Sequence, residues 1–511
     1  MKVTITVNNV WSRLSGFEGV ELVDMLDKQM SYYVEGHRFT RAFTNGYRDK
    51  DGQWRHWDGK RHLLTRSMVF PTGLCQRVEK FLDFHSVPFA ISDRREKPLG
   101  EALAVFGHSP RPYQQEAANA AFNSGRGIIR IGTGGGKTFV AAMMIARYNV
   151  PAMIYVIGKD LLYQFHEELV KALGPDDVGM IGDGHCDVRR FNVCSIWTAA
   201  TAFDLKSKTV SLDDEDWQPE VLDLNAAKKG EIKRAVTESG LAIFDEAHFI
   251  ACDTIQSIFK ASKKCRYLFG LTGTDWRDDG ADLLLESVCG QRIYNAKSST
   301  LIDQGYLVPP KIVMLEMPKH PDIKKKMMWS EVYSRYITHN DDRNEAVVNA
   351  AKQLISMGRK VLILVRYIKH GKNLVDMMGD VPVFFVSGEL DGESRRDVKN
   401  RFEAGEIQCL VASSVFDIGV DIPSLDALVL AGGGKSTVRA LQRIGRVIRR
   451  GGEHKKDALV VDFIDNAKYL DKHSATRIAV YETEPRFQIK FPKGFNRGSL
   501  KKIRTVKTKI R

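Results

Sequence analysis

Two sets of short apolar segments constrain the fold of this 511-residue sequence more than any other feature. In each set, runs of four to six apolar and β-branched residues alternate with segments of helical periodicity. Strands that are apolar throughout belong to parallel sheets covered by helices on both faces. The sequence therefore predicts an α/β protein with two parallel-sheet domains in tandem. The expected strands are GIIRI (127–131), AMIYVI (152–157), FNVCSI (191–196), LAIF (241–244) and YLFGL (267–271), then KVLILV (360–365), VPVFFV (381–386), IQCLVA (407–412), ALVLA (427–431) and ALVVDF (458–463).

Proline and composition place the expected domain boundaries. Pro309 and Pro310 interrupt the pattern where the first set ends, because proline and the residue before it disfavour regular structure. The first hundred residues fit neither set and predict a separate, small α+β domain. The expected parts are 1–100, 101–306, 307–485 and a basic C-terminal tail, 486–511.

Residues 204–240 interrupt the first set with an acidic cluster followed by the helix-like stretch NAAKKGEIKRAVTES. A surface insertion is the favoured interpretation, and an element that binds another molecule is the alternative.

Charge suggests a polyanionic partner, because the net charge is +13. Nine lysines and arginines lie between Lys490 and Arg511 without an acidic residue, so most of the excess belongs to the tail. Such a tail is either solvated or in contact with phosphates.

Composition excludes two classes of protein. A hydrophobic content of 43% is typical of soluble globular chains, and no apolar run is long enough to span a membrane. The N-terminus lacks the apolar core of a signal peptide, so we expect a cytoplasmic protein without a membrane partner. The seven cysteines form no CxxC pair and predict reduced thiols rather than a zinc or disulfide framework.

The stretch GTGGGKT follows an expected strand and opens a helical pattern, which is the context of a phosphate-binding P-loop. Glycines let backbone N–H groups converge on phosphate oxygens. Lys137 is expected to reach the β- and γ-phosphates of ATP, and the Thr138 hydroxyl to hold Mg²⁺. Ile131 stands where the general pattern has glycine. The predicted loop residues are Gly132, Thr133, Gly134, Gly135, Gly136, Lys137 and Thr138.

A second motif, IFDEAH, ends the strand at 241–244. Ligands of α/β proteins bind at the carboxyl ends of strands, which is where Asp245 and Glu246 are expected. Asp245 would hold Mg²⁺ through water, and Glu246 would orient and deprotonate the attacking water. GLTGT (270–274), after the next strand, would respond to the state of this segment.

The stretch QRIGRVIR concentrates guanidinium groups in the second set. Helical spacing places Gln442, Arg446 and Arg449 on one face, where the arginines would repel one another without an anion. An arginine supplied to a transferring phosphoryl group raises the rate by ~10³–10⁵. Arg446 and Arg449 are therefore predicted to be catalytic.

In this order the four motifs resemble those of superfamily 2 helicases and translocases. The resemblance covers residues 105–465 and implies two RecA-like domains that bind ATP. RPYQ (111–114) resembles the adenine-reading Q-motif, which implies nucleotide contacts for Arg111 and Gln114. VASSVFDIGVDIP (411–423) resembles motif V and implies them for Gly419 and Asp421. VIGKDLLYQF and SIWTA resemble strand-gripping motifs Ia and Ib, which implies nucleic-acid contacts for Lys159 and Thr198.

Two further motifs resemble those of particular groups within this superfamily. GLTGTDWRDDG is similar to a pattern of XPB-like enzymes, which also carry an aliphatic residue at the position of Ile131. FTRAF…QWRHWDGKRHLL…FPTGL resembles the N-terminal domain of phage UvsW-like branch-migration helicases. That family implies action on forked and four-way DNA in recombination, repair and replication. The long 204–240 segment and the basic tail depart from the shared pattern.

The stretch QWRHWDGKR (53–61) permits two interpretations. Trp57, Asp58 and Gly59 are expected to form a turn, whereas Arg55, Lys60 and Arg61 are predicted to contact DNA phosphates. Trp54 is compatible with either role.

The predicted function is an ATP-dependent DNA helicase, active as a monomer on branched or single-stranded DNA. An RNA helicase is the first alternative, because both α/β domains grip mainly the backbone of the strand. A nucleic-acid annealing protein that uses the basic tail is the second.

Overall fold

The structure is a computed structural model. It describes residues 2–34, 36–49, 51–205, 210–212, 215–217, 224–273, 282–320, 326–387, 392–413, 422, 424–434, 437–450, 455 and 457–496. The chain divides into two compact units, which we describe separately. One comprises Met1–Arg130 and Gly136–Asn295, and the other comprises Ile131–Gly135 and Ala296–Arg511.

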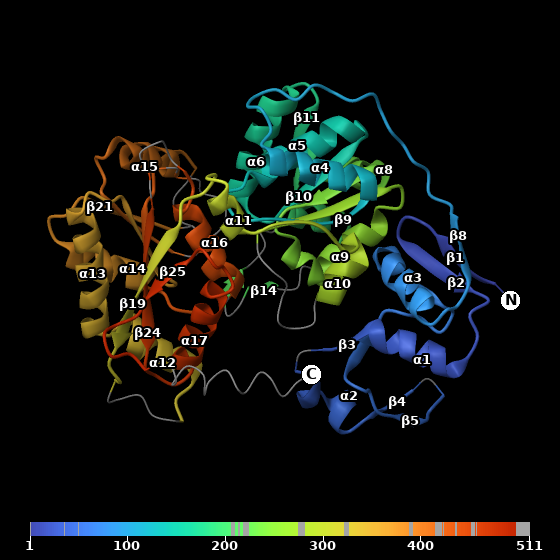
Figure 1. The fold of residues 1–511 in the computed structure, drawn as a ribbon, viewed down its shortest axis with the longest axis horizontal. Helices are drawn as coiled ribbons and strands as arrows, with labels where there is room; N and C mark the ends of the chain where they lie inside the picture. Colours follow the sequence, from blue (N-terminus) through green and yellow to red (C-terminus); the bar gives the residue numbers. More distant parts are fainter. Residues whose placement is uncertain are drawn as a thin grey trace. The chain divides into compact units, whose positions relative to one another are not determined.

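The N-terminal domain, blue in Figure 1, contains a four-stranded sheet in the order β7-β2-β1-β8. β1 pairs antiparallel with β2 and parallel with β8. Alternate residues of β1 are buried, so one face of the sheet is covered, as an α+β domain requires. The elements are β1 (Val3–Val7), β2 (Trp11–Ser15), α1 (Val20–Gln29), β3 (Ser31–Tyr33), η1 (His37–Phe39), α2 (Arg41–Thr44), β4 (Tyr47–Arg48), β5 (Trp54–Arg55), β6 (Lys60–His62), β7 (Val69–Pro71), η2 (Thr72–Leu74), α3 (Cys75–Phe84) and β8 (Phe89–Asp93).

The first α/β domain has an eight-stranded sheet in the order β12-β11-β13-β10-β16-β17-β9-β18. All five strands expected from the first apolar set are present in it, and their mutual pairings are parallel. β11, β12 and β18 were not expected from the sequence, because they lie toward the edges of the sheet, where the apolar pattern is weaker. The elements are α4 (Pro112–Ser124), β9 (Arg126–Ile131), α5 (Lys137–Tyr148), β10 (Ala152–Val156), α6 (Lys159–Leu173), β11 (Val178–Gly182), β12 (His185–Asp187), β13 (Phe191–Ser195), α7 (Ile196–Ala202), β14 (Val210–Leu212), β15 (Glu215–Trp217), α8 (Ala226–Glu238), β16 (Leu241–Phe244), η3 (Ala247–Ala251), α9 (Asp253–Ala261), β17 (Tyr267–Thr272), α10 (Asp282–Cys289) and β18 (Arg292–Ala296).

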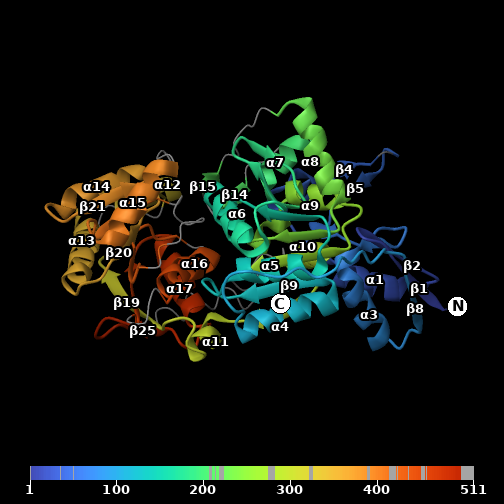
Figure 2. The ribbon, with the colours of Figure 1, turned by 90° about the horizontal axis from the view of Figure 1, so that it is seen from above.

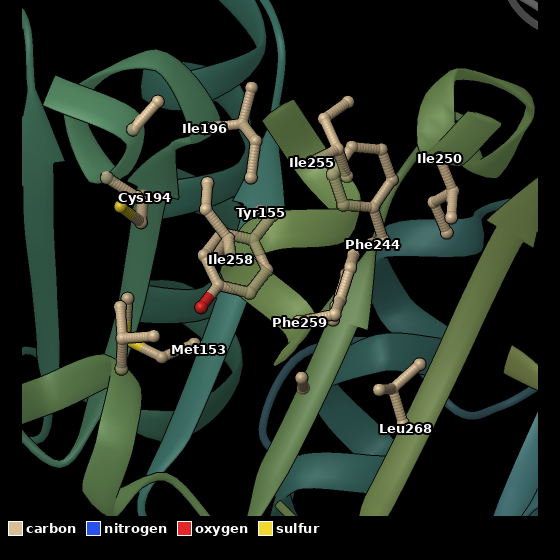
Figure 3. Close-up of a cluster of buried hydrophobic side chains, with 14 of the residues drawn as sticks. Met153, Tyr155, Cys194, Ile196, Phe244, Ile250, Ile255, Ile258, Phe259 and Leu268 are labelled. Atoms are coloured by element: carbon tan, nitrogen blue, oxygen red, sulfur yellow. The ribbon is translucent and has the colours of Figure 1, made fainter. Parts of the chain in front are cut away.

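Side chains from strands and covering helices interlock on one face of this sheet (Figure 3). Tyr155 of β10 lies 6.3 Å from Phe244 of β16, and Phe259 of α9 lies within 6 Å of both ring centroids. Each fully buried large apolar side chain contributes about 1.5–3 kcal/mol. This cluster therefore fixes β16, and with it the acidic residues that follow, against the helical layer.

The segment 204–240 differs from the surface insertion that we expected. Its second half is helix α8, whose N-cap Asn225 accepts a hydrogen bond from the backbone N–H of Lys228. Ile232 and Val236 of α8 are fully buried in the domain core. The helix is thus part of the layer that covers the sheet, and the β14–β15 hairpin precedes it in the chain.

The second α/β domain has a seven-stranded, entirely parallel sheet in the order β21-β22-β20-β23-β24-β19-β25. It contains every strand expected from the second apolar set, so the fold class is confirmed. The edge strand β25 and its neighbour β19 were not expected. The elements are α11 (Ser298–Asp303), β19 (Pro310–Met317), α12 (Trp329–Tyr333), η4 (Ser334–Thr338), α13 (Asp341–Ser356), β20 (Val361–Leu364), α14 (Ile368–Met378), β21 (Val383–Val386), α15 (Gly392–Ala404), β22 (Cys409–Ala412), β23 (Ala427–Leu430), α16 (Thr437–Val447), β24 (Ala458–Asp465), α17 (Leu470–Tyr481) and β25 (Gln488–Lys490).

Two buried ion pairs join the helices of this domain to the end of β24. Arg343 of α13 donates to Asp465 at 2.9 Å, and both side chains are fully buried. Arg477 of α17 donates twice to Asp462, at 2.9 Å each. Each arginine also donates to a backbone carbonyl in segment 431–434, which follows β23. These bonds hold the segment that leads into α16.

Two further sequence expectations concern the whole chain. All seven cysteines are free thiols, as expected. Among the residues that the structure describes, no helix is both long and apolar enough to cross a membrane.

We predict that Arg343→Leu lowers the free energy of unfolding of the second α/β domain by about 3–5 kcal/mol, because the Asp465 carboxylate is left buried and unpaired. Arg335→Leu is the matched control, since its ion pair with Glu331 is half exposed and contributes at most about 1 kcal/mol. Urea denaturation measures both. Equal, small losses would contradict the role given to the buried pair.

Candidate active site

The glycine loop between β9 and α5 has the backbone of a phosphate-binding loop. Gly134 and Gly136 have φ angles of +87° and +76°, a region that other residues rarely adopt. A Cβ atom at Gly135 would overlap the side chain of Ile131 and lie 2.9 Å from the Gly132 carbonyl oxygen. These three positions must therefore be glycine, and this lets phosphate oxygens approach the backbone at the N-terminus of α5.

The aliphatic residue at the start of the loop has a structural explanation. Ile131 is fully buried and ends β9, and Gly132 donates to the Ala296 carbonyl at 2.9 Å. Segment Ile131–Gly135 belongs to the second compact unit, whereas Gly136 and Lys137 belong to the first.

Three charged side chains meet where β16 ends. The Lys137 ammonium donates to Glu246 Oε1 at 2.8 Å and lies 3.8 Å from Asp245 Oδ1. All three side chains are largely buried, with exposures of 12%, 16% and 6% for Lys137, Glu246 and Asp245. The P-loop lysine and the DEAH carboxylates, 108 and 109 residues apart, therefore form one charged cluster at a strand end.

The two carboxylates have different electrostatic surroundings. Burial raises the pKa of Asp245, and the neighbouring negative charge of Glu246 adds to this rise. Burial acts in the same direction on Glu246, but the Lys137 ammonium, followed by His248 at 3.4 Å, lowers the pKa of this carboxyl well below its usual range. Glu246 is thus held ionised, and an ionised carboxylate can accept a hydrogen bond from a bound water.

Glu246 also carries a backbone conformation that is uncommon for its residue type. Its φ of 54° and ψ of 55° lie in the left-handed region, which costs about 1–3 kcal/mol for a residue other than glycine. Such conformations cluster at functional sites because the surrounding structure must hold them. Here β16 and η3, on either side of the residue, supply that constraint.

Asp245 fits the role of a magnesium ligand. Its Oδ1 atom is buried and has no hydrogen-bond partner among the residues that the structure describes. A buried carboxylate oxygen is costly unless a cation or a hydrogen-bond donor contacts it, and the Lys137 ammonium at 3.8 Å lies beyond hydrogen-bond distance. Asp245 and the Thr138 hydroxyl on the first turn of α5 are the residues that would hold Mg²⁺.

The predicted Q-motif is joined directly to the glycine loop. Arg111 is the N-cap of α4, and the amide oxygen of Gln114 accepts the Arg111 backbone N–H at 2.9 Å. The amide nitrogen of Gln114 donates to the Gly136 carbonyl at 3.4 Å. Gln114 is buried, so it couples the start of α4 to the P-loop.

The segment GLTGT packs against the DEAH segment, as expected for an element that responds to it. A Cβ atom at Gly270 of β17 would lie only 2.7 Å from the Ala247 side chain. A glycine is therefore required for this close approach. Thr274, the last residue of the segment, lies outside the described residues.

In the second unit, buried apolar side chains hold the helix that carries Arg446, one of the two predicted arginines. Gln442 and Arg446 lie on α16, whose Ile444 and Val447 are fully buried. Arg449 lies beyond the helix end and forms an isolated β-bridge with Leu307, so the three residues do not share one helix. The predicted nucleotide contacts Gly419 and Asp421 lie outside the described residues.

The side chains expected to contact nucleic acid differ in accessibility. Lys159, at the start of α6, is half exposed and pairs with Asp183 at 2.7 Å. Thr198 is only 1% exposed, because α7 turns it into the domain core, so the structure corrects its assignment as a surface contact.

The N-terminal candidates are surface groups that already have intramolecular partners. Arg55 donates to Asp49 at 3.0 Å, and Lys60 lies over the Tyr33 ring at 5.0 Å. Arg61 pairs with Asp253 on α9 at 2.8 Å.

The expected WDG turn is present. The Trp57 indole donates to the Lys60 carbonyl at 2.7 Å, and the Asp58 carboxylate accepts the Lys60 backbone N–H at 3.0 Å. Gly59 has a φ of +79°, and a Cβ atom there would overlap the ring of His37. Trp57, Asp58 and Gly59 therefore have a structural role in this turn.

The carboxylates that hold these cations were not expected from the sequence. Asp253 lies 192 residues from Arg61 in sequence, and no local pattern joins them. Asp49 had a usable signal, since an aspartate before a DG pair is typical of a turn that its own side chain closes.

Comparisons with known proteins place the chain in a class. Residues 107–276 match the model described as type III restriction enzyme, res subunit, and residues 346–451 match the helicase conserved C-terminal domain. Together with the fold, these matches show an ATP-hydrolysing helicase of superfamily 2.

Particular relatives sharpen this assignment. The chain is 27% identical over 490 residues to the ATP-dependent DNA helicase uvsW of Enterobacteria phage T4, covering 89% of this chain and 92% of that protein. It is 27% identical over 369 residues to the DNA 3'-5' helicase XPB of Kineococcus radiotolerans, covering 69% and 59% of the two chains. The resemblance to UvsW-like helicases is therefore confirmed over most of the length.

A solved structure supports the fold alone. Dbp5 of S. cerevisiae, bound to RNA and ADP BeF3, shares 14% identity at a TM-score of 0.51, covering 77% of this chain and 94% of that chain.

We predict that Lys137→Ala lowers the kcat of nucleic-acid-stimulated ATP hydrolysis by about a hundredfold or more, because the only ammonium expected at the transferring phosphoryl group is removed. Lys171→Ala is the matched control, since Lys171 forms an exposed pair with Glu168 on α6. Phosphate release measures both. Normal hydrolysis by Lys137→Ala would show that the site is assigned wrongly.

Proposed function

We propose that this helicase uses ATP and Mg²⁺ to remodel branched DNA, such as forks and Holliday-type junctions, in recombination, repair and replication. The relatives with the two highest similarities described above are both named as DNA helicases. RNA, although bound by the more distant Dbp5 structure, is therefore the less favoured substrate.

The observation that carries the proposal is the attachment of the N-terminal domain to the first α/β domain. Arg77 of α3 forms a two-pronged pair with Glu286 of α10, at 3.1 and 2.5 Å. Arg126 donates to the Asn9 carbonyl at 2.7 Å, and Leu283 of α10 belongs to the N-terminal core. The accessory domain therefore belongs to the same contact unit as the P-loop lysine and the DEAH carboxylates.

This attachment suits a translocase that works at a branch. A motor that only moves along one DNA strand needs a further element that contacts the second strand, or the second arm of the junction. An accessory domain fixed to the ATP-binding domain keeps a constant position relative to it during each cycle, and so can turn tracking into strand displacement.

The proposed chemistry assigns a role to each side chain of the site. Gln114 and Arg111 read the adenine, and the glycine loop and Lys137 hold the phosphates. Glu246 orients and deprotonates the attacking water. Mg²⁺, held by Thr138 and Asp245, neutralises phosphate charge. Further proposed contacts are Gly419 and Asp421 with the nucleotide, and Arg446 and Arg449 with the transition-state charge.

We expect forks and four-way junctions to be remodelled at least about tenfold faster than plain duplexes with 5′ or 3′ tails, and DNA to stimulate ATPase more than RNA. Gel-based unwinding on matched substrates and ATPase assays with single-stranded DNA, RNA and a junction test this. Equal rates on plain duplexes, or stronger stimulation by RNA, would refute the proposal.

We also expect Arg61 to contact a DNA phosphate, since its half-exposed pair with Asp253 is worth at most about 1 kcal/mol and can be released at little cost. Arg61→Asp should weaken junction binding and lower the slope of binding against log salt by about one. The double variant Arg61→Asp with Asp253→Arg restores an ion pair but not the original position of the cation. Full recovery of binding in that swap would show that Arg61 serves only to join the domains.

A further inference from the structure

The β4–β5 hairpin of the N-terminal domain exposes one aromatic ring and one guanidinium on each of its two faces. In its register Arg48 pairs with Trp54, and Tyr47 pairs with Arg55. Cross-strand partners share a face, and successive residues of a strand alternate between faces. Trp54 therefore lies with Arg48, whose guanidinium is 5.9 Å from the ring centroid, and Tyr47 lies with Arg55 on the opposite face.

Both rings are exposed, and core packing does not explain them. Trp54 is 64% and Tyr47 47% accessible, and neither belongs to the hydrophobic core of the N-terminal domain. Figures 1 and 2 show the hairpin at the margin of this domain in both views. Exposed rings alone are common on protein surfaces, and what distinguishes these two is the guanidinium that shares each face.

The turn keeps this short hairpin ordered. A ladder of two residue pairs is marginal by itself. Asp49 compensates, because its Oδ1 accepts the backbone N–H groups of Asp51 at 3.0 Å and Gln53 at 2.8 Å. Its Oδ2 accepts Arg55 Nε at 3.0 Å, and Gly52 takes a φ of +77° that the turn requires. The bond to Asp49 uses Nε, so the outer end of the Arg55 guanidinium stays at the surface.

The chemistry of these faces fits unpaired bases. An aromatic ring stacks on any base regardless of sequence, and a guanidinium beside it can meet the adjoining phosphate. Arg48 forms no ion pair with any residue in the described part of the chain, and Arg55 is 57% exposed. A protein partner would cover one face, whereas two equivalent faces suit two strands that separate around the hairpin.

We propose that the β4–β5 hairpin is a blade that enters the branch point of DNA, with a base of one strand stacked on Trp54 and a base of the other strand stacked on Tyr47. Arg48 and Arg55 contact the phosphates next to these bases. The blade rests on the proposed action on branched DNA and supplies the element that keeps the two strands apart as the motor advances.

The test uses the full-length protein with Trp54→Ala, Tyr47→Ala and the double variant. Phe84→Ala is the matched control, because Phe84 is an exposed ring (82%) on α3 of the same domain, outside the hairpin. Trp54→Phe keeps a stacking ring, and Trp54→Leu keeps an apolar side chain without one. Thermal melting confirms that each variant folds as the parent does.

The first readout is the number of base pairs separated per ATP hydrolysed on a fork. We expect this ratio to fall about tenfold or more in the double variant, in line with the loss of one stacked base per ring. Trp54→Phe should retain most of the ratio, Trp54→Leu should lose it, and Phe84→Ala should match the parent. A parental ratio in the double variant would overturn the blade.

The second readout is binding without ATP to a static fork that carries 2-aminopurine at the first unpaired position of each strand. Stacking on Trp54 quenches one probe, and stacking on Tyr47 quenches the other. Each single variant should abolish one of the two signals and spare the other. Loss of both signals in either variant, or of neither, would contradict the two-faced arrangement.

These readouts separate the two proposals. A parent protein that hydrolyses ATP on single strands but does not remodel forks refutes the proposed function. The static-fork signals then decide the blade alone.

Discussion

The rest of the structure depends on parallel strands that are buried on both faces. Such strands leave no room for polar side chains except at their ends, so reactive groups collect at one edge of the sheet. The glycine loop follows β9, Asp245 and Glu246 follow β16, and the GLTGT segment continues β17. The same packing that makes the core apolar therefore assembles a phosphate-binding loop, two carboxylates and a close glycine contact without any long-range signal in the sequence.

Opposite charges lie close together at this edge of the sheet. Lys137 and Glu246 neutralise one another at 2.8 Å in a largely buried setting, and Asp245 keeps a buried oxygen available for a cation. An ammonium or a carboxylate left alone there would pay a large desolvation cost. The left-handed backbone of Glu246 adds strain at the same place, so the surrounding structure must hold this residue firmly.

Most of the α/β framework could be predicted from the sequence, because apolar runs are local signals, and the spaced motifs predicted which residues would meet at one edge of the sheet. The strands β11, β18 and β19, which lie at or next to the edges of their sheets, were not expected, and α8 was expected to be part of a surface insertion because Ile232 and Val236 are sparse apolar signals. Thr198 shows the limit of motif resemblance, since a residue in the expected motif turned out to be buried. Partners such as Asp253 and Glu286 could not be found, because tertiary folding alone brings them to Arg61 and Arg77.

The stretch that contains Trp54 and Trp57 shows which features the local sequence determines and which depend on the tertiary structure. The sequence by itself determined that Asp58 and Gly59 form a turn, because a positive φ and a short side-chain cap are local requirements. It also determined the fold class, and it predicted the phosphate loop. Only the tertiary structure decided that Trp57 is held inside the turn while Trp54 stays exposed, and that the N-terminal domain is fixed to α9 and α10. Burial and ion pairing depend on which surfaces come into contact in the folded protein. The local sequence around a residue does not specify those contacts.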